Sequence, residues 1–91
     1  MNECRVNITS DESTQIELLF YRYNAYLAIL SRLNLPDNSE ILDKKITETA
    51  EIYILLEQLK AQLDNKYHPT GHWTSYEFDF INHQMVYRNE E

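Results

Sequence analysis

Residues 35–66, LPDNSEILDKKITETAEIYILLEQLKAQLDNK, decide the fold of this chain. After Pro36 the stretch holds neither glycine nor proline and is rich in Glu, Lys, Leu, Ile and Ala, which predicts one long helix from Asp37 to Lys66. Five consecutive apolar residues, Ile52–Leu56, make the middle of this helix apolar on nearly every side. A helix of that kind is covered on more than one side, so other segments of the chain are expected to pack on it.

The composition limits the class of protein. Ninety-one residues with 43% apolar side chains make a single domain, residues 1–91. Fifteen acidic against eight basic residues give a net charge of −7, which disfavours a nucleic-acid backbone or an anionic membrane as ligand and favours a basic protein partner. With one cysteine, no signal-peptide pattern and no run long enough to span a membrane, the expected location is the cytoplasm.

The segment before the long helix predicts a strand followed by a first helix. Residues 4–8 alternate, with Cys4, Val6 and Ile8 on one face. Thr9 with Glu12 fits a capping box that starts a helix from Ser10 to Leu33. The core-facing residues of that helix recur at spacings of three and four: Ile16, Leu19, Tyr23, Tyr26, Leu30 and Leu33, widened by Phe20 and Leu27.

A second apolar set lies on the far side of the first helix: Leu18, Tyr21, Ala25, Ala28 and Ile29. The simpler interpretation is that a second layer of the same domain covers this set. The alternative is a face for a dimer or another partner, where the two alanines allow close approach of a backbone.

The long helix turns back on the first after the break at residues 34–37, with Asp37 as the expected N-cap. Its main face comprises Leu42, Ile52, Leu56, Leu59 and Leu63, widened by Ile41, Ile46, Tyr53 and Leu55. Acids flank this face in two rows, one of Glu40, Glu48 and Glu51 and the other of Asp43, Glu57 and Asp64. Ile54 is expected to point away from the core.

After the loop at His68–Gly71, the alternating residues 73–80 predict a strand with Tyr76, Phe78 and Phe80 on one face. A two-residue turn at Asn82 and His83 would close a hairpin. That turn pairs Phe80 with Met85, Phe78 with Tyr87 and Glu77 with Arg88.

These elements predict an α+β fold, in which an antiparallel two-helix hairpin packs on a three-stranded antiparallel sheet made of the N-terminal strand and the C-terminal β-hairpin. The hairpin would then cover part of the Ile52–Leu56 run. The alternative is an all-α helical hairpin that dimerises, with an extended C-terminal tail.

No catalytic or cofactor motif stands in the sequence. His68 and His72 are four residues apart, but the proline and glycine between them prevent the helical spacing that zinc sites use. A three-ligand site with Cys4 or His83 is the alternative, and loop histidines in water are the simpler interpretation. Cys4 beside Arg5 is best explained as a small strand side chain. Glu77 and Asp79 share a strand face in water, and the single glycine excludes a phosphate-binding loop. We therefore expect no enzyme activity, no metal and no cofactor.

The features that remain are surfaces. Small acidic single domains without catalytic motifs are common among inhibitors that phages and mobile elements encode, so the first hypothesis is an interaction module that binds and inhibits a basic, nucleic-acid-handling protein. The alternative is an accessory subunit or obligate homodimer that assembles through the apolar helix faces. The candidate partner-binding residues are Glu40, Glu48, Glu51, Ile54, Tyr21, Tyr67, Trp73, Glu77 and Asp79.

Overall fold

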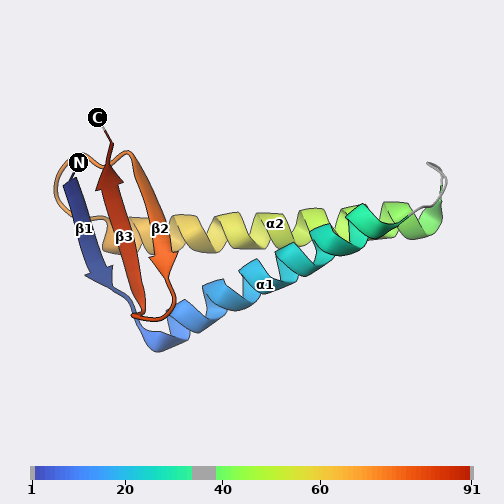
Figure 1. Cartoon of the computed structure of the whole chain (residues 1–91), viewed down its shortest axis with the longest axis horizontal. Coiled ribbons are helices and arrows are strands. Elements are labelled where there is room, and N and C mark those ends of the chain that lie inside the picture. The colour runs from blue at the N-terminus through green and yellow to red at the C-terminus, as the bar shows by residue number, and fades with distance from the viewer. Residues whose placement is uncertain (1, 34–38, 91) are drawn as a thin grey trace.

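The computed structural model describes residues 2–33 and 39–90. Its elements follow the order β1 (Asn2–Asn7), α1 (Ser10–Arg32), α2 (Glu40–Tyr67), β2 (Ser75–Asp79) and β3 (Gln84–Asn89). The strands form one antiparallel sheet of order β1-β3-β2, which lies across one end of the helix pair, and the helices run on well beyond it (Figure 1). The α+β prediction is confirmed. The all-α alternative is wrong, because the C-terminal segment is a paired hairpin and not an extended tail.

The start of α1 confirms the predicted capping box. The backbone N–H of Glu12 donates to Thr9 Oγ1 at 3.1 Å, and the backbone N–H of Thr9 donates to Glu12 Oε1 at 2.9 Å. Two N–H groups that the first helical turn leaves unpaired are satisfied in this way. The helix ends at Arg32, one residue before the predicted end.

The start of α2 differs from the prediction. Ser39 is the N-cap, with its side chain accepting from the backbone N–H of Leu42, so the helix begins at Glu40. The predicted cap, Asp37, lies outside the described residues. At the other end the backbone N–H of His68 donates to the Asp64 carbonyl at 2.8 Å, and Pro69 follows, which cannot continue the helix.

The register predicted for the hairpin is wrong by two residues. Phe78 pairs with Met85 and Tyr76 with Tyr87, and a four-residue loop, 80–83, replaces the two-residue turn. The carboxylate of Asp79 fixes this loop, because it accepts the backbone N–H groups of Ile81 and Asn82, both at 3.1 Å. The positive φ falls on His83, at 53°.

A shift of two residues keeps each side chain on its predicted face of the sheet. The predicted ion pair between Glu77 and Arg88 therefore forms, at 2.6 Å, although it is diagonal because Arg88 lies opposite Ser75. The first strand is also displaced from its predicted range, 4–8, to Asn2–Asn7. Ile8 lies just beyond it, buried, with its N–H bonded to the His83 carbonyl at 2.9 Å.

The core lies where the sheet meets the helices. Its buried cluster comprises Ile8, Ile16, Leu56, Leu63, Met85 and Tyr87. Phe20 of α1 packs edge-on against Phe78 and Phe80, with ring centroids 6.3 and 5.9 Å apart. The six predicted core-facing residues of α1 are all buried or half-buried, and so are the five of the main face of α2.

One expectation about cover is wrong, and the other, that the hairpin covers part of the Ile52–Leu56 run, holds at Leu56, which joins Met85 and Tyr87 in the buried cluster. The five residues on the far side of α1 are all exposed, so no second layer of the described chain covers them. In the Ile52–Leu56 run only the first and last residues are buried, while Tyr53, Ile54 and Leu55 are about half exposed. The reason is position, since the sheet packs at the end of the helix pair and leaves the middle with one neighbouring helix.

Candidate functional site

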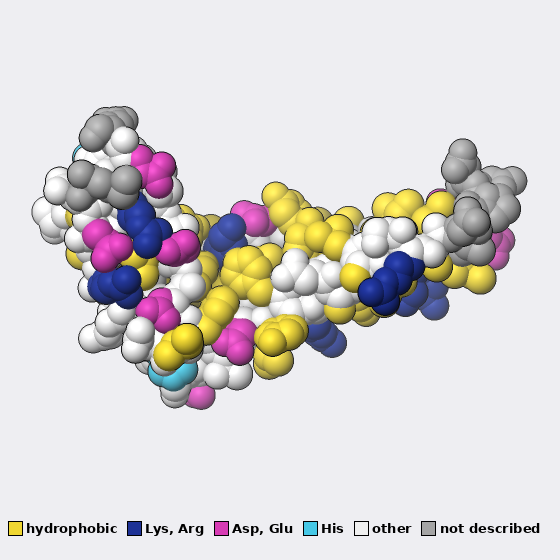
Figure 2. Space-filling view, in the orientation of Figure 1, with side chains coloured by type: hydrophobic (Ala, Val, Ile, Leu, Met, Phe, Trp, Pro, Cys, Tyr) yellow, Lys and Arg dark blue, Asp and Glu magenta, His cyan; other side chains and the backbone are white. Residues whose placement is uncertain are grey.

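The helices beyond the sheet form an arm, which we define as residues 22–33 and 39–55. Here each helix packs only on the other, and apolar side chains on their flanks stay in water: Leu27 (41% exposed), Ile29 (38%), Ile41 (61%), Ile46 (49%), Tyr53 (47%), Ile54 (53%) and Leu55 (52%). Figure 2 shows hydrophobic side chains along the helices, whereas acidic and basic side chains alternate over the sheet end. Seven of the ten large apolar side chains that are exposed among the described residues lie on the arm.

One flank of the arm carries a shallow apolar groove of about 280 Å³. Tyr23 and Leu30 of α1 form one wall, and Ile46, Ala50 and Tyr53 of α2 form the other, with Thr49 also lining it. The rings of Tyr23 and Tyr53 pack with centroids 5.6 Å apart, and the Thr49 hydroxyl donates to the Lys45 carbonyl, so it adds no unpaired donor to the groove. The groove is therefore suited to an apolar side chain.

The charges of the arm balance. Arg22, Arg32, Lys44 and Lys45 carry four positive charges, and Glu40, Asp43, Glu48 and Glu51 carry four negative ones. Lys45 Nζ pairs with Glu48 at 3.1 Å and lies 5.3 Å from the centroid of the Tyr26 ring. The sheet end, residues 2–21 and 56–90, holds four basic and nine acidic side chains, a net −5. Among the described residues, the net negative charge thus belongs to the sheet end.

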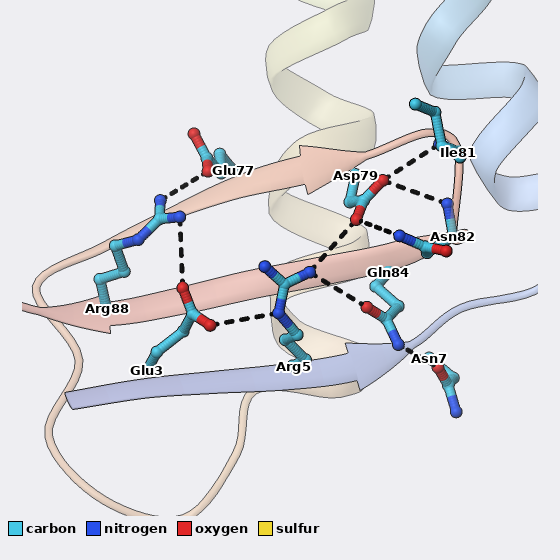
Figure 3. Close-up of polar contacts among 9 residues, drawn as sticks. All are labelled: Glu3, Arg5, Asn7, Glu77, Asp79, Ile81, Asn82, Gln84 and Arg88. Atoms are coloured by element: carbon cyan, nitrogen blue, oxygen red, sulfur yellow. Dashed lines mark hydrogen bonds and ion pairs between the residues drawn. The ribbon is translucent and has the colours of Figure 1, made fainter.

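The outer face of the sheet carries a polar network that includes the predicted Glu77 and Asp79 (Figure 3). Arg5 pairs with Glu3 at 3.1 Å and with Asp79 at 3.2 Å, and Arg88 pairs with Glu77 and Glu3. Hydrogen bonds from Asn82, helped by those from Ile81 and Arg5, lower the pKa of Asp79. Both predicted carboxylates are therefore engaged within the chain, and they hold the strands and the loop together.

The predicted Tyr67 and Trp73 lie where α2 meets the sheet. The Tyr67 hydroxyl and Lys66 Nζ, at the end of α2, both donate to the carboxylate of Glu12 on α1. Burial alone would raise the pKa of Glu12, but these two donors and Thr9 lower it to about 2. Trp73 packs on Tyr87, with ring centroids 6.5 Å apart, and its indole N–H donates to the Thr70 carbonyl. Both aromatic residues are half-buried structural contacts.

The candidate residues are not gathered into one site. Glu40, Glu48, Glu51 and Ile54 belong to the arm, with Ile54 exposed as predicted. Among the described residues no hydrogen bond or ion pair engages the carboxylates of Glu40 and Glu51. Tyr21 is 70% exposed at the base of the arm, on the face of α1 turned away from α2.

The groove residues were missed as a site, because Ile46 and Tyr53 were assigned to a widened core face. The available signal was the width of the apolar stripe on α2. From Leu55 through Ile52 to Ile46 it spans about half of the helix circumference at 100° per residue, which is more than one neighbouring helix covers.

The reactive side chains are dispersed. Cys4 is half-buried on the inner face of β1, opposite Tyr87, while His83 sits in the hairpin loop. His68 Nδ1 lies 3.0 Å from Asp64, whose carboxylate also accepts from the Tyr87 hydroxyl at 2.6 Å. Over residues 2–33 and 39–90, no group of three or more His, Cys, Asp and Glu side chains is placed to hold a metal ion.

Comparisons of the chain with protein-family models, with curated proteins and with solved structures find no match. The helices of the described segments include none that is both long and apolar enough to cross a membrane. What bears on function is therefore the geometry of the surface.

Proposed function

We propose that this chain is a non-enzymatic protein-interaction module that assembles through its arm. The observation that carries the proposal is the exposure of seven large apolar side chains on the arm, between 38 and 61% each. Full burial of such a side chain stabilises by roughly 1.5–3 kcal/mol, so leaving several half exposed forgoes a substantial driving force. Where such side chains adjoin, as Ile46 and Tyr53 do at the groove, the apolar surface is typical of a binding face.

The structure supports the choice of apolar over acidic contacts. Of the five carboxylates expected to meet a basic partner, Glu48, Glu77 and Asp79 already pair with basic side chains of this chain. The expected cytoplasmic location belongs to the same proposal, since a single cysteine fits a reducing compartment.

The test compares two Ile→Glu substitutions in a binding experiment. Ile46→Glu places a charge at the groove, and Ile81→Glu places the same charge on the hairpin loop, where Ile81 is 90% exposed. Tagged versions of the original chain and of both variants are mixed with an extract of the native host and with an untagged copy of this chain. The proteins that bind to each tagged chain are then isolated. We expect Ile46→Glu to lose its partners and Ile81→Glu to keep them. Equal recovery by both variants would contradict the arm as the interface.

A second candidate, a basic partner that the module inhibits, rests on the net −5 of the sheet end. Association steered by this charge would weaken steeply as salt is raised. A partner whose affinity is the same at about 50 mM and about 500 mM salt would exclude this second candidate and leave the apolar one untouched.

A further inference from the structure

The chain exposes more surface than a compact monomer of its mass. Its accessible area is 6478 Å², whereas a folded monomer of 10.9 kDa is expected to expose about 5600 Å². Its radius of gyration is 16.4 Å, against about 12 Å expected for 91 residues, because the arm extends the long dimension to 49 Å. The excess of roughly 900 Å² is close to the ~800 Å² that each partner buries in a standard interface.

The balance of charge on the arm is compatible with a second copy of the arm as its partner. A second arm carries four positive and four negative charges as well, so two arms meet without net repulsion. The sheet ends, at −5 each, repel one another. Antiparallel arms place the two sheet ends at opposite ends of the assembly, separated by much more than the Debye length of about 8–10 Å. Parallel arms would place them side by side.

The groove and the side chains that would fill it lie on the same flank, which is the condition for a two-fold symmetric interface. Ile46 and Tyr53 project four residues before and three residues after Ala50, so they are neighbours along one face of α2. The small side chain of Ala50 leaves a gap between them that lets a second helix approach. If Ala50 faces Ala50 of the other copy across antiparallel helices, Ile46 of one chain meets Tyr53 of the other.

From area, charge and shape we infer that the arm binds a second copy of this chain, with the two α2 helices antiparallel and the two-fold axis near Ala50. The inference rests on the proposed function and deepens it by naming the partner. Each copy places Ile46 and Tyr53 in the groove of the other, and the four helices of the two arms form a bundle with the sheets at its outer ends.

The first experiment measures mass over a concentration series by sedimentation equilibrium. The expected mass of the original chain and of Ile81→Glu is twice 10.9 kDa, the mass of one chain. Ile46→Glu is expected to raise the dimer dissociation constant by roughly 100-fold or more, because a two-fold interface carries the change twice. Circular dichroism confirms that the variants remain folded.

The second experiment tests the orientation with a short bismaleimide cross-linker in a Cys4→Ser background. Ala50→Cys places a thiol at the proposed axis and is expected to cross-link to itself. Ile46→Cys places the two thiols about 12 Å apart along the helix axes, eight residues at 1.5 Å each, and is expected not to cross-link. Cross-linking of both variants would indicate parallel arms and overturn the inference.

A monomeric mass at every concentration would also overturn the inference. The host binding experiment with Ile46→Glu then decides about the proposed function separately. If Ile46→Glu no longer binds a different protein that the original chain binds, the arm is an interface for that other partner. If Ile46→Glu binds every protein that the original chain binds, both the inference and the proposed function are wrong.

Discussion

Leu55 and Leu56 are adjacent on α2 but have different surroundings. Leu56 is 2% exposed in the core between the helices and the sheet, and Leu55 is 52% exposed on the flank of the arm away from the groove. One step along a helix turns a side chain by 100°, which is enough to move it from core to solvent. Because the residue type and the helix are the same, the pair isolates the effect of burial.

Leu56→Ala is expected to lower the free energy of unfolding by about 2–5 kcal/mol, since it removes buried methyl groups and leaves a cavity. Leu55→Ala, the matched control, should change it by no more than about 0.5 kcal/mol. Urea unfolding followed by circular dichroism measures both. Similar losses of unfolding free energy for the two variants would mean that the core does not lie on the Leu56 side of α2.

Glu12 links the cap of α1 to the end of α2, and its lowered pKa makes the fold sensitive to acid. Its pKa is about 2 in the folded chain against an ordinary 4.5, so the folded state binds this proton less tightly. The stabilisation is therefore complete above about pH 4.5 and is lost as the pH falls towards 2.

Glu12→Gln keeps a side-chain oxygen for the cap but removes the charge that Lys66 pairs with. We expect this variant to be less stable at pH 7 and to lose less stability between pH 5 and pH 2 than the original chain. Unfolding midpoints measured across that range give the comparison. An unchanged slope would show that Glu12 does not carry the acid sensitivity.

Among the elements, the helices could be predicted well and the hairpin register could not. The capping box, the three-and-four spacing and the absence of Gly and Pro each favour the same helices, so the signals reinforce one another. For the hairpin, both registers place Phe78, Met85 and Tyr87 on the inner face. Apolar alternation therefore cannot distinguish them, and the local hydrogen bonds of Asp79 favour the four-residue loop.

Asp79→Ala is expected to lower the melting temperature more than Glu77→Ala does. Both change an acid on β2, but Asp79 accepts two loop N–H groups and the Asn82 side chain in addition to its ion pair, whereas Glu77 makes one ion pair at a more exposed site. Thermal melting by circular dichroism ranks the two. The reverse order would mean that the loop does not depend on Asp79.

Over the whole molecule, the sequence indicated too much apolar surface for the helices but not where the surplus would lie. Ile46 and Tyr53 satisfy the helical period of a core face, and a period does not distinguish burial by the same chain from burial by another. The position of the sheet at one end of the helix pair determines which apolar side chains this chain buries itself. It covers Ile16, Leu56 and Leu63 and leaves the groove at Ala50 open for an antiparallel second copy.

Hydrogen–deuterium exchange of the unmodified chain at low and high protein concentration tests this account most directly. If two arms cover each other, backbone amides of residues 40–55 exchange more slowly at high concentration, while those of β3, the central strand of the sheet, change little. Ile81→Glu should show the same concentration dependence, and Ile46→Glu should lose it. Arm amides that exchange equally fast at both concentrations in the unmodified chain would contradict the account.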